Sequence, residues 1–121
     1  IDTALREAYE EIGLTPTLVR VMGCLKPVRS PAGFVVQPFV GIISCNSFFE
    51  LQHNPAEVDS IFTLPLAHIG QPDNFSLVLR EANGHDNSYW VVSHSTYHIW
   101  GLSARVLNDL RQRLFHGPML P

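Results

Sequence analysis

The spacing of apolar residues changes twice along the chain, and this change limits the folds that are open to it. Apolar residues recur at helical spacing over residues 2–12 and again over residues 101–115. The segments between them are short, apolar and rich in β-branched residues. Gly13 is a natural end for the first helix, and Gly117 for the second. This order predicts an α/β (mixed α+β) fold in which a mixed sheet lies between helices, as in an α/β/α sandwich.

The elements between the two helices are expected to be mostly strands. The predicted strands are residues 18–25, 34–45, 60–64, 75–81 and 88–94. We expect the first two to form one hairpin, and the last two to form another around a turn at residues 83–87. Residues 46–54 are interpreted as irregular, and residues 65–69 as a turn or a short helix.

Composition excludes several classes of protein. The 121 residues, 45% hydrophobic and 16% charged, fit one folded domain and not a disordered chain. A net charge of -3 without a basic stripe argues against nucleic acid as a partner. No stretch approaches the roughly 20 apolar residues of a membrane span. Cys24 and Cys45 lie in apolar runs, are expected to be buried, and favour an intracellular location, cytoplasmic or organellar.

The first helix carries the residues with the most informative chemistry. Glu7, Glu10 and Glu11 are spaced at i, i+3 and i+4, so their carboxylates share one helix face. Carboxylate oxygens are the ligands that Mg²⁺ and Mn²⁺ prefer. Arg6 precedes Glu10 by four residues and can orient its carboxylate. The alternative for such a face is a solvated acidic surface without a ligand.

The same helix resembles the core of a known family motif. From Arg6 to Gly13 the sequence reads Arg-Glu-x-x-Glu-Glu-x-Gly, and this string resembles the Nudix box of diphosphate hydrolases. The resemblance implies the Nudix α/β/α sandwich and a catalytic Mg²⁺ or Mn²⁺. It implies that Glu10 and Glu11 are metal ligands, that Glu7 is a ligand or helps to activate water, and that Arg6 orients the glutamates.

Part of the family pattern would lie upstream of this sequence. The box opens with a glycine and a further acidic residue that would precede Ile1, as would a glycine-rich loop and the first strands of the sheet. We therefore expect residues 1–121 to be a single, N-terminally incomplete Nudix domain.

Later segments narrow the resemblance to one subfamily. Residues 33–41, 54–66 and 99–107 each resemble coenzyme A diphosphatases, in the same order along the chain. This implies a small-molecule diphosphate substrate, coenzyme A or a derivative, cleaved to 4′-phosphopantetheine and 3′,5′-ADP. The coenzyme A motif of that subfamily would lie upstream of Ile1, so a Nudix hydrolase of ADP-ribose, a dinucleotide or a nucleoside triphosphate remains an alternative. A homodimer is left open.

Two further alternatives concern activity. A Nudix-like domain can bind a nucleotide or a protein without turning it over, although such a module has no need of all three helix glutamates. A segment that lacks its early strands can also be inactive by itself, although the parent protein is an enzyme, because an unpaired sheet edge is then exposed.

Other titratable residues are weaker candidates for the site. Glu57 precedes a predicted strand, where it is a candidate ligand or acid/base group, against the interpretation as a surface glutamate in a helical turn. Glu81 is a less favoured candidate. His94 and His98 lie on a stretch interpreted as strand-to-loop, and no spacing of histidines indicates zinc.

The sequence assigns no substrate-binding residue. Phe34, Phe39 and Arg29 could border a substrate cleft, and Arg29 could meet a phosphate, but a solvated loop arginine is the favoured interpretation. Trp90 and Trp100 are interpreted as anchors of the core or the sheet, and not as stacking groups for a base.

Overall fold

The structure is a computed structural model, and it describes residues 1–30, 32–58, 60–82, 84–86 and 88–116. The chain divides into two compact units. Unit 1 holds Ile1–Cys24 and Phe39–Thr63, and unit 2 holds Leu25–Pro38 and Leu64–Leu120. Each unit is described by itself.

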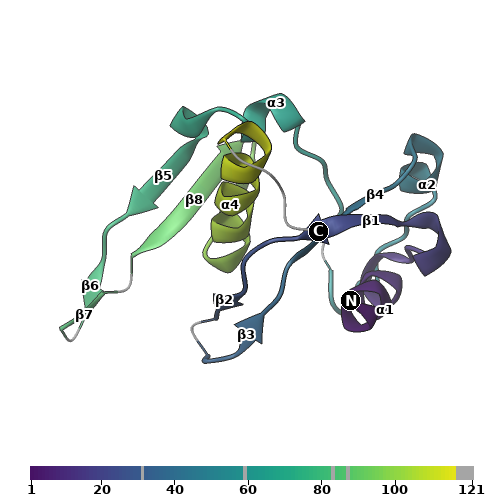
Figure 1. Ribbon diagram of the computed structural model, residues 1–121, viewed down its shortest axis with the longest axis horizontal. Coiled ribbons are helices and arrows are strands. Elements are labelled where there is room, and N and C mark those ends of the chain that lie inside the picture. The colour runs from purple at the N-terminus through teal and green to yellow at the C-terminus, as the bar shows by residue number, and fades with distance from the viewer. Residues whose placement is uncertain (31, 59, 83, 87, 117–121) are drawn as a thin grey trace. The chain divides into compact units, whose positions relative to one another are not determined.

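Unit 1 combines two helices with one antiparallel ladder (Figure 1). Strands β1 (Arg20–Cys24) and β4 (Phe39–Ile42) pair from Arg20 opposite Ile42 to Cys24 opposite Phe39, as the predicted first hairpin requires. The register shifts between Val21 and Gly23, which indicates a bulge. A short 3-10 helix, η1 (Pro16–Leu18), leads into β1.

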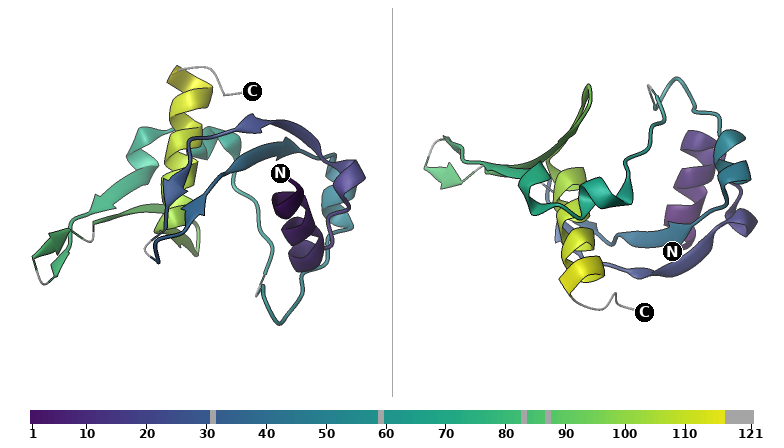
Figure 2. Two further views of the ribbon diagram at one scale, coloured as in Figure 1. Left: turned by 60° about the horizontal axis from the view of Figure 1, so that its bottom comes forward. Right: turned by 90° about the horizontal axis from the view of Figure 1, so that it is seen from above.

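Helix α1 (Asp2–Ile12) forms where helical spacing predicts it. It ends at Gly13, whose φ of 71° lies in the left-handed region, and the Gly13 amide donates to the carbonyls of Ala8 and Tyr9. The apolar side of α1 and residues of β1 and β4 together line a cleft of about 250 Å³. Figures 1 and 2 show this helix alongside the ladder. The polar side, with its glutamates, is therefore left to solvent.

Two segments of unit 1 differ from their predictions. Residues 46–54 are not irregular throughout, because helix α2 (Cys45–Phe49) begins there, with the Ser44 hydroxyl accepting from the Ser47 amide. Cys45 is exposed on this helix, so its predicted burial is wrong, and Cys24 is half-buried. The described residues of 60–64 form no strand, since no neighbouring strand pairs with them.

The described strands of unit 2 form three separate sheets. Strands β2 (Val28–Arg29) and β3 (Val35–Val36) form a small hairpin. Strands β5 (Phe75–Val78), β8 (Tyr89–His94) and β9 (Tyr97–Trp100) form an antiparallel sheet in the order β5-β8-β9. Strands β6 (Glu81–Ala82) and β7 (His85–Asp86) extend the predicted second hairpin. Asn83 and Asn87 of its turn lie outside the described residues.

Helices cover one face of the three-stranded sheet. Helix α4 (Leu102–His116) packs on β8 and β9, as Figures 1 and 2 show. Helix α3 (Leu66–Ile69) and the 3-10 helix η2 (Pro72–Asn74) lead into β5. The core of unit 2 is a cluster of four buried residues, Ile69, Phe75, Val92 and Ala104. The predicted end of the last helix at Gly117 lies outside the described residues.

Strand β9 is another element that the sequence analysis missed. Residues after His94 were interpreted as leaving the sheet, but Ser95, at a φ of 56°, turns the chain back so that β9 pairs with β8. Because side chains alternate along a strand, Ile99 enters the core and its neighbour Trp100 faces away from it.

Helices and strands together confirm the expected α+β class, and every described ladder is antiparallel. The strands form four small sheets in the described part of the chain, where the sequence predicted one mixed sheet. Among the described residues, no helix is both long and apolar enough to cross a membrane.

Candidate metal centre on helix α1

Arg6 lies between two of the candidate glutamates. Its Nη2 is 3.7 Å from Glu7 Oε1, and its Nε is 3.9 Å from Glu10 Oε1. About half of each glutamate side chain is exposed, so these ion pairs contribute little to stability. One guanidinium thus lies near two carboxylates that are one turn apart on the same helix face. The orienting role of Arg6 stays a prediction.

Glu11 is the glutamate most affected by its neighbours. Partial burial raises the pKa of the Glu11 carboxyl above its usual 4.5, and the charge of Glu7, that of Glu57, a hydrogen bond with Glu7 and the charge of Glu10 raise it further. All of these causes disfavour the charged form. Burial and the neighbouring carboxylates therefore disfavour ionised Glu11, and a nearby cation would favour it.

The chain brings Glu57 to this group from outside the helix. The amides of Gln52 and Asn54 donate to the last carbonyls of α1, those of Ile12 and Glu11, across 3.1 and 2.8 Å. A Cβ at Gly13 would lie 3.4 Å from the Gln52 carbonyl oxygen, an ordinary contact, so the left-handed φ of 71° is what favours glycine there.

A turn at Asn54 then sets the position of Glu57. The Asn54 side-chain oxygen accepts from the Ala56 amide at 3.1 Å, and its carbonyl accepts from the amides of Glu57 and Val58. Glu57 is exposed on this turn, yet close enough to Glu11 for its charge to act on that carboxyl. The structure thus brings Glu57 within electrostatic reach of Glu11.

The donor chemistry fits a hard divalent cation. Four carboxylates, those of Glu7, Glu10, Glu11 and Glu57, lie in one region of unit 1, and repulsion among them helps to raise the pKa of Glu11. Hard divalent cations prefer such oxygen ligands. Their side chains are nevertheless not drawn together: no three His, Cys, Asp or Glu side chains of the described residues are grouped so as to hold a metal ion.

Other sequence candidates lie elsewhere. Glu81 is on β6 in unit 2, so it is not part of the carboxylate group of unit 1. Arg29 and Phe34 belong to the β2–β3 hairpin of unit 2 and its turn, and both are exposed. Phe39 is half-buried on β4 and lines the cleft beside the apolar side of α1.

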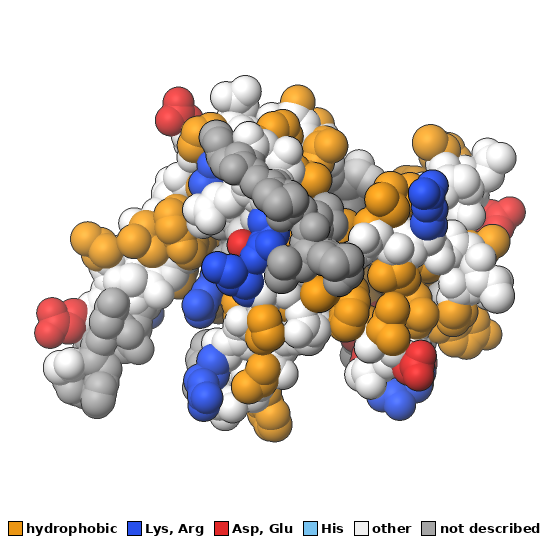
Figure 3. All heavy atoms as spheres, in the orientation of Figure 1, with side chains coloured by type: hydrophobic (Ala, Val, Ile, Leu, Met, Phe, Trp, Pro, Cys, Tyr) orange, Lys and Arg blue, Asp and Glu red, His pale blue; other side chains and the backbone are white. Residues whose placement is uncertain are grey.

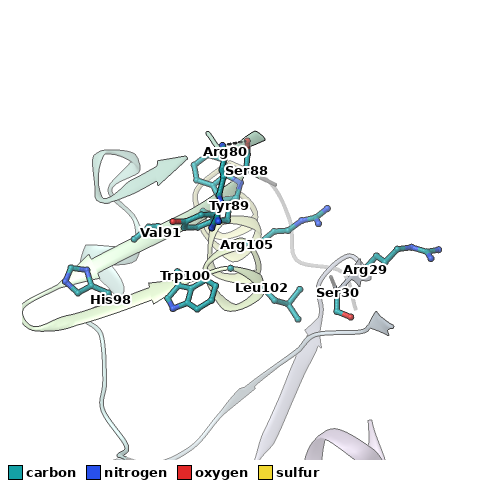
Figure 4. A pocket seen from close by; sticks show the side chains of 12 residues that line it. Arg29, Ser30, Arg80, Ser88, Tyr89, Val91, His98, Trp100, Leu102 and Arg105 are labelled. Carbon is teal, nitrogen blue, oxygen red and sulfur yellow. Dashed lines mark hydrogen bonds between the residues drawn. The ribbon is translucent and has the colours of Figure 1, made fainter. Parts of the chain in front are cut away.

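The sequence analysis missed a pocket in unit 2. Figure 3 shows blue Lys and Arg side chains gathered over α4 and the β2–β3 hairpin. Arg80 and Arg105 line the pocket together with Arg29 and Trp100, as Figure 4 shows. Trp90 packs against the core as predicted. Trp100 lies on strand β9, so it belongs to the sheet, but it is 67% exposed and is not a core anchor. The signal that could have identified it was alternation, because Trp100 follows Ile99 directly and takes the opposite face.

Comparisons with known proteins give a consistent picture. No family model matches the chain. The chain is 34% identical over 118 residues, 98% of its length, to an uncharacterised Nudix hydrolase NudL of Enterobacter sp. (strain 638). It is 36% identical over 118 residues to the NudL protein of Klebsiella pneumoniae (strain 342), and 36% identical over 110 residues to that of Salmonella paratyphi B.

The chain spans 60% of the length of the Enterobacter and Klebsiella relatives. The similarity runs through both compact units, since it covers nearly the whole chain. The chain is thus similar, over nearly its whole length, to part of proteins named Nudix hydrolases.

Proposed function

We propose that this chain is the metal-binding part of a Nudix enzyme that hydrolyses a diphosphate linkage. The observation that carries the proposal is the group of carboxylates around Glu11, whose pKa is raised by partial burial and by the charges of Glu7, Glu57 and Glu10. Groups with perturbed pKa values cluster at functional sites. The similarity to proteins named Nudix hydrolases supports the same reaction class.

In this proposal each residue of the site has a distinct task. Glu10 and Glu11 are metal ligands, and Glu7 is a ligand or accepts a proton from the attacking water. Arg6 orients Glu7 and Glu10, with which it pairs. Glu57 is an additional ligand or acid/base group that approaches from the Asn54 turn. A bound Mg²⁺ or Mn²⁺ supplies neutralisation of the charge on the diphosphate oxygens.

The proposed substrate is coenzyme A, cleaved to 4′-phosphopantetheine and 3′,5′-ADP. Its support is the resemblance of residues 33–41, 54–66 and 99–107 to coenzyme A diphosphatases. ADP-ribose or a dinucleotide is the alternative within the same reaction class. We further propose that residues 1–121 form part of one Nudix domain and that the protein is intracellular. Light scattering would distinguish a monomer from a homodimer.

The test is a turnover assay with the protein expressed from its complete reading frame. Coenzyme A, ADP-ribose and a dinucleotide are each incubated with Mg²⁺, with Mn²⁺ and with EDTA, and the products are separated by chromatography. We expect metal-dependent release of 3′,5′-ADP from coenzyme A, and its loss in Glu10→Gln. Glu50→Gln is the matched control, because Glu50 is exposed and is not among the groups that raise the pKa of Glu11.

Other outcomes discriminate among the alternatives. Cleavage of ADP-ribose or a dinucleotide, but not of coenzyme A, would support metal-dependent diphosphate hydrolysis and would reject coenzyme A as the substrate. A folded protein that binds Mn²⁺ or a nucleotide without turning over any diphosphate is instead a binding module. The ungrouped carboxylates of the described residues are the observation that favours this second candidate.

A further inference from the structure

Two histidine rings lie against each other in unit 2, apart from the carboxylate group of unit 1. His68 is on α3 and His94 is the last residue of β8. Their ring centroids are 4.6 Å apart at an interplanar angle of 73°, and both residues are half-buried. The two elements are distant in sequence, so it is the tertiary structure that makes this contact.

The backbone that carries each ring is held by hydrogen bonds. The His68 amide donates to the Pro65 carbonyl at 3.0 Å, and the His68 carbonyl accepts from the Asn74 side-chain amide at 2.8 Å. His94 is paired with Tyr97 of β9 at the end of the β8–β9 ladder. A ligand of the two rings would therefore bind between elements that the fold already holds in place.

One further hydrogen bond determines which nitrogen of His68 is protonated. The Nε2 atom lies 2.7 Å from the Ser93 carbonyl oxygen. A carbonyl oxygen can only accept, so Nε2 carries the proton, and Nδ1 of the neutral ring keeps its lone pair. Histidines that bind metals show this arrangement, since a ligating imidazole donates its other N–H to a carbonyl or a carboxylate.

The spacing of the two rings also suits one shared ion. Metal–nitrogen bonds of about 2 Å put the centroids of two imidazoles on one ion roughly 4.5–5 Å apart when the angle at the metal is near a right angle or somewhat wider. The 4.6 Å between His68 and His94 lies in this range. No third His, Cys, Asp or Glu of the described residues completes the group, so water would fill the remaining coordination positions.

His98 is close to the pair in the chain but belongs to the other face of the sheet. It lies opposite Ser93, and its Nδ1 is 2.9 Å from Ser93 Oγ. Because side chains alternate along β8, Ser93 and His94 point to opposite faces. Figure 4 shows His98 among the residues of the arginine-lined pocket. His98 is therefore a matched control for the two paired histidines.

We propose that His68 and His94 together bind a borderline divalent transition-metal ion, Cu²⁺ most tightly and Zn²⁺ more weakly. Imidazole nitrogens suit both ions, and Cu²⁺ is bound most strongly among the divalent first-row metals. Mg²⁺ and Mn²⁺ prefer oxygen ligands, so this ion differs in kind from the one proposed for α1. Both histidines belong to unit 2, and the proposal does not rest on the proposed hydrolysis.

Calorimetry with the untagged chain tests the binding. Cu²⁺, Zn²⁺ and Mn²⁺ are titrated with Mg²⁺ in excess, and every protein carries Cys45→Ser because the exposed thiol would bind the same ions. His68→Gln and His94→Gln should each weaken Cu²⁺ binding about tenfold or more, whereas His98→Gln should not. Glu10→Gln should bind Cu²⁺ like the parent protein, which separates this test from the hydrolysis assay.

Two further measurements report on the site itself. Electron paramagnetic resonance of the protein with one equivalent of Cu²⁺ should show two imidazole nitrogens on the ion. This spectrum tests the pair without any variant, so it remains decisive if a histidine variant does not fold. Zn²⁺ should also raise the unfolding temperature of the parent protein and of His98→Gln, but not of His68→Gln or His94→Gln, because the ion joins α3 to β8.

Three results would overturn the proposal. One is Cu²⁺ affinity that is the same in the parent protein, His68→Gln and His94→Gln. Another is a loss in only one of these variants, which would mean that the two rings do not share an ion. The third is a Cu²⁺ spectrum of the parent protein with fewer than two imidazole nitrogens.

Discussion

The Asn54 amide donates a hydrogen bond to the Glu11 carbonyl oxygen across 2.8 Å, and this bond joins the end of α1 to the turn that carries Glu57. It links two segments more than 40 residues apart through backbone atoms alone. The glutamates of α1 share a face through helical geometry, but the fourth carboxylate arrives only because this loop docks on the helix end.

Replacing Glu57 with Gln should lower the pKa of Glu11. The charge of Glu57 is one of the causes that raise this pKa, so a neutral amide relieves part of the repulsion. NMR titration of the metal-free protein measures the shift directly. If Glu57 is a ligand or supports one, Mn²⁺ affinity should also fall about tenfold. Glu50→Gln should change neither quantity, and an unshifted Glu11 pKa in Glu57→Gln would contradict the charge coupling.

Glu11→Gln should stabilise the metal-free protein near neutral pH. The folded-state pKa of Glu11 lies above its ordinary value of 4.5, so the folded state holds this proton more tightly than the unfolded state. The contribution to stability is present below pH 4.5 and is lost as pH rises through the folded pKa. At pH 7 the variant should gain a few tenths of a kcal/mol for each repulsive pair it removes.

Urea unfolding at pH 3 and pH 7 in EDTA tests this sign. The two proteins should differ at pH 7 and converge at pH 3, where the wild-type carboxyl is protonated in both states. With Mn²⁺ present, the order at pH 7 should reverse, because the wild type alone keeps the ligand. A variant that is less stable than the wild type at pH 7 in EDTA would refute the prediction.

Gly13→Ala should destabilise unit 1. The φ of 71° is unfavourable for any residue with a Cβ, at about 1–2 kcal/mol, and the new methyl group would lie 3.4 Å from the Gln52 carbonyl oxygen. Thermal unfolding of the two proteins measures the loss. Gly13→Asn should lose less, because asparagine visits the left-handed region more readily. Equal losses in both variants would mean that crowding by Gln52, and not φ, dominates.

Val92→Ala should be costly in unit 2. Val92 is fully buried between Phe75 and Ala104, and removal of two methyl groups costs about 2 kcal/mol from lost burial and the cavity that remains. Chemical denaturation provides the measurement. Leu79→Ala is the control, because Leu79 is 79% exposed and should change stability by less than about 0.5 kcal/mol. Similar losses at both positions would contradict the core assignment.

Local signals in the sequence were sufficient to predict the two long helices, α1 and α4. The extents of α1 and α4 follow from helical spacing and from glycine at or near their ends, since these are interactions between residues three or four apart. Ser44 was also a readable start signal for α2, because serine three residues before Ser47 can accept its amide, but the prediction passed over it.

Strands were less predictable because their partners are distant in sequence. Residues 60–64 have a strand-like composition, yet no described strand pairs with them. Strand β9 has a mixed composition, yet it pairs with β8 because Ser95 and its neighbours reverse the chain. The β-propensity of a segment shows only that it can form a strand, and whether it does so depends on a neighbouring strand with which it can pair.

By itself the sequence determined the acidic face of α1, with Arg6 between Glu7 and Glu10, because helix geometry fixes which side chains are neighbours. Only the tertiary structure decided that Glu57 joins Glu11 and that Trp100 faces a pocket with Arg105. The first depends on a backbone hydrogen bond from a docked loop, and the second on strand pairing that turns Ile99 inward. Such contacts depend on how distant segments pack, which the spacing of neighbouring residues does not specify.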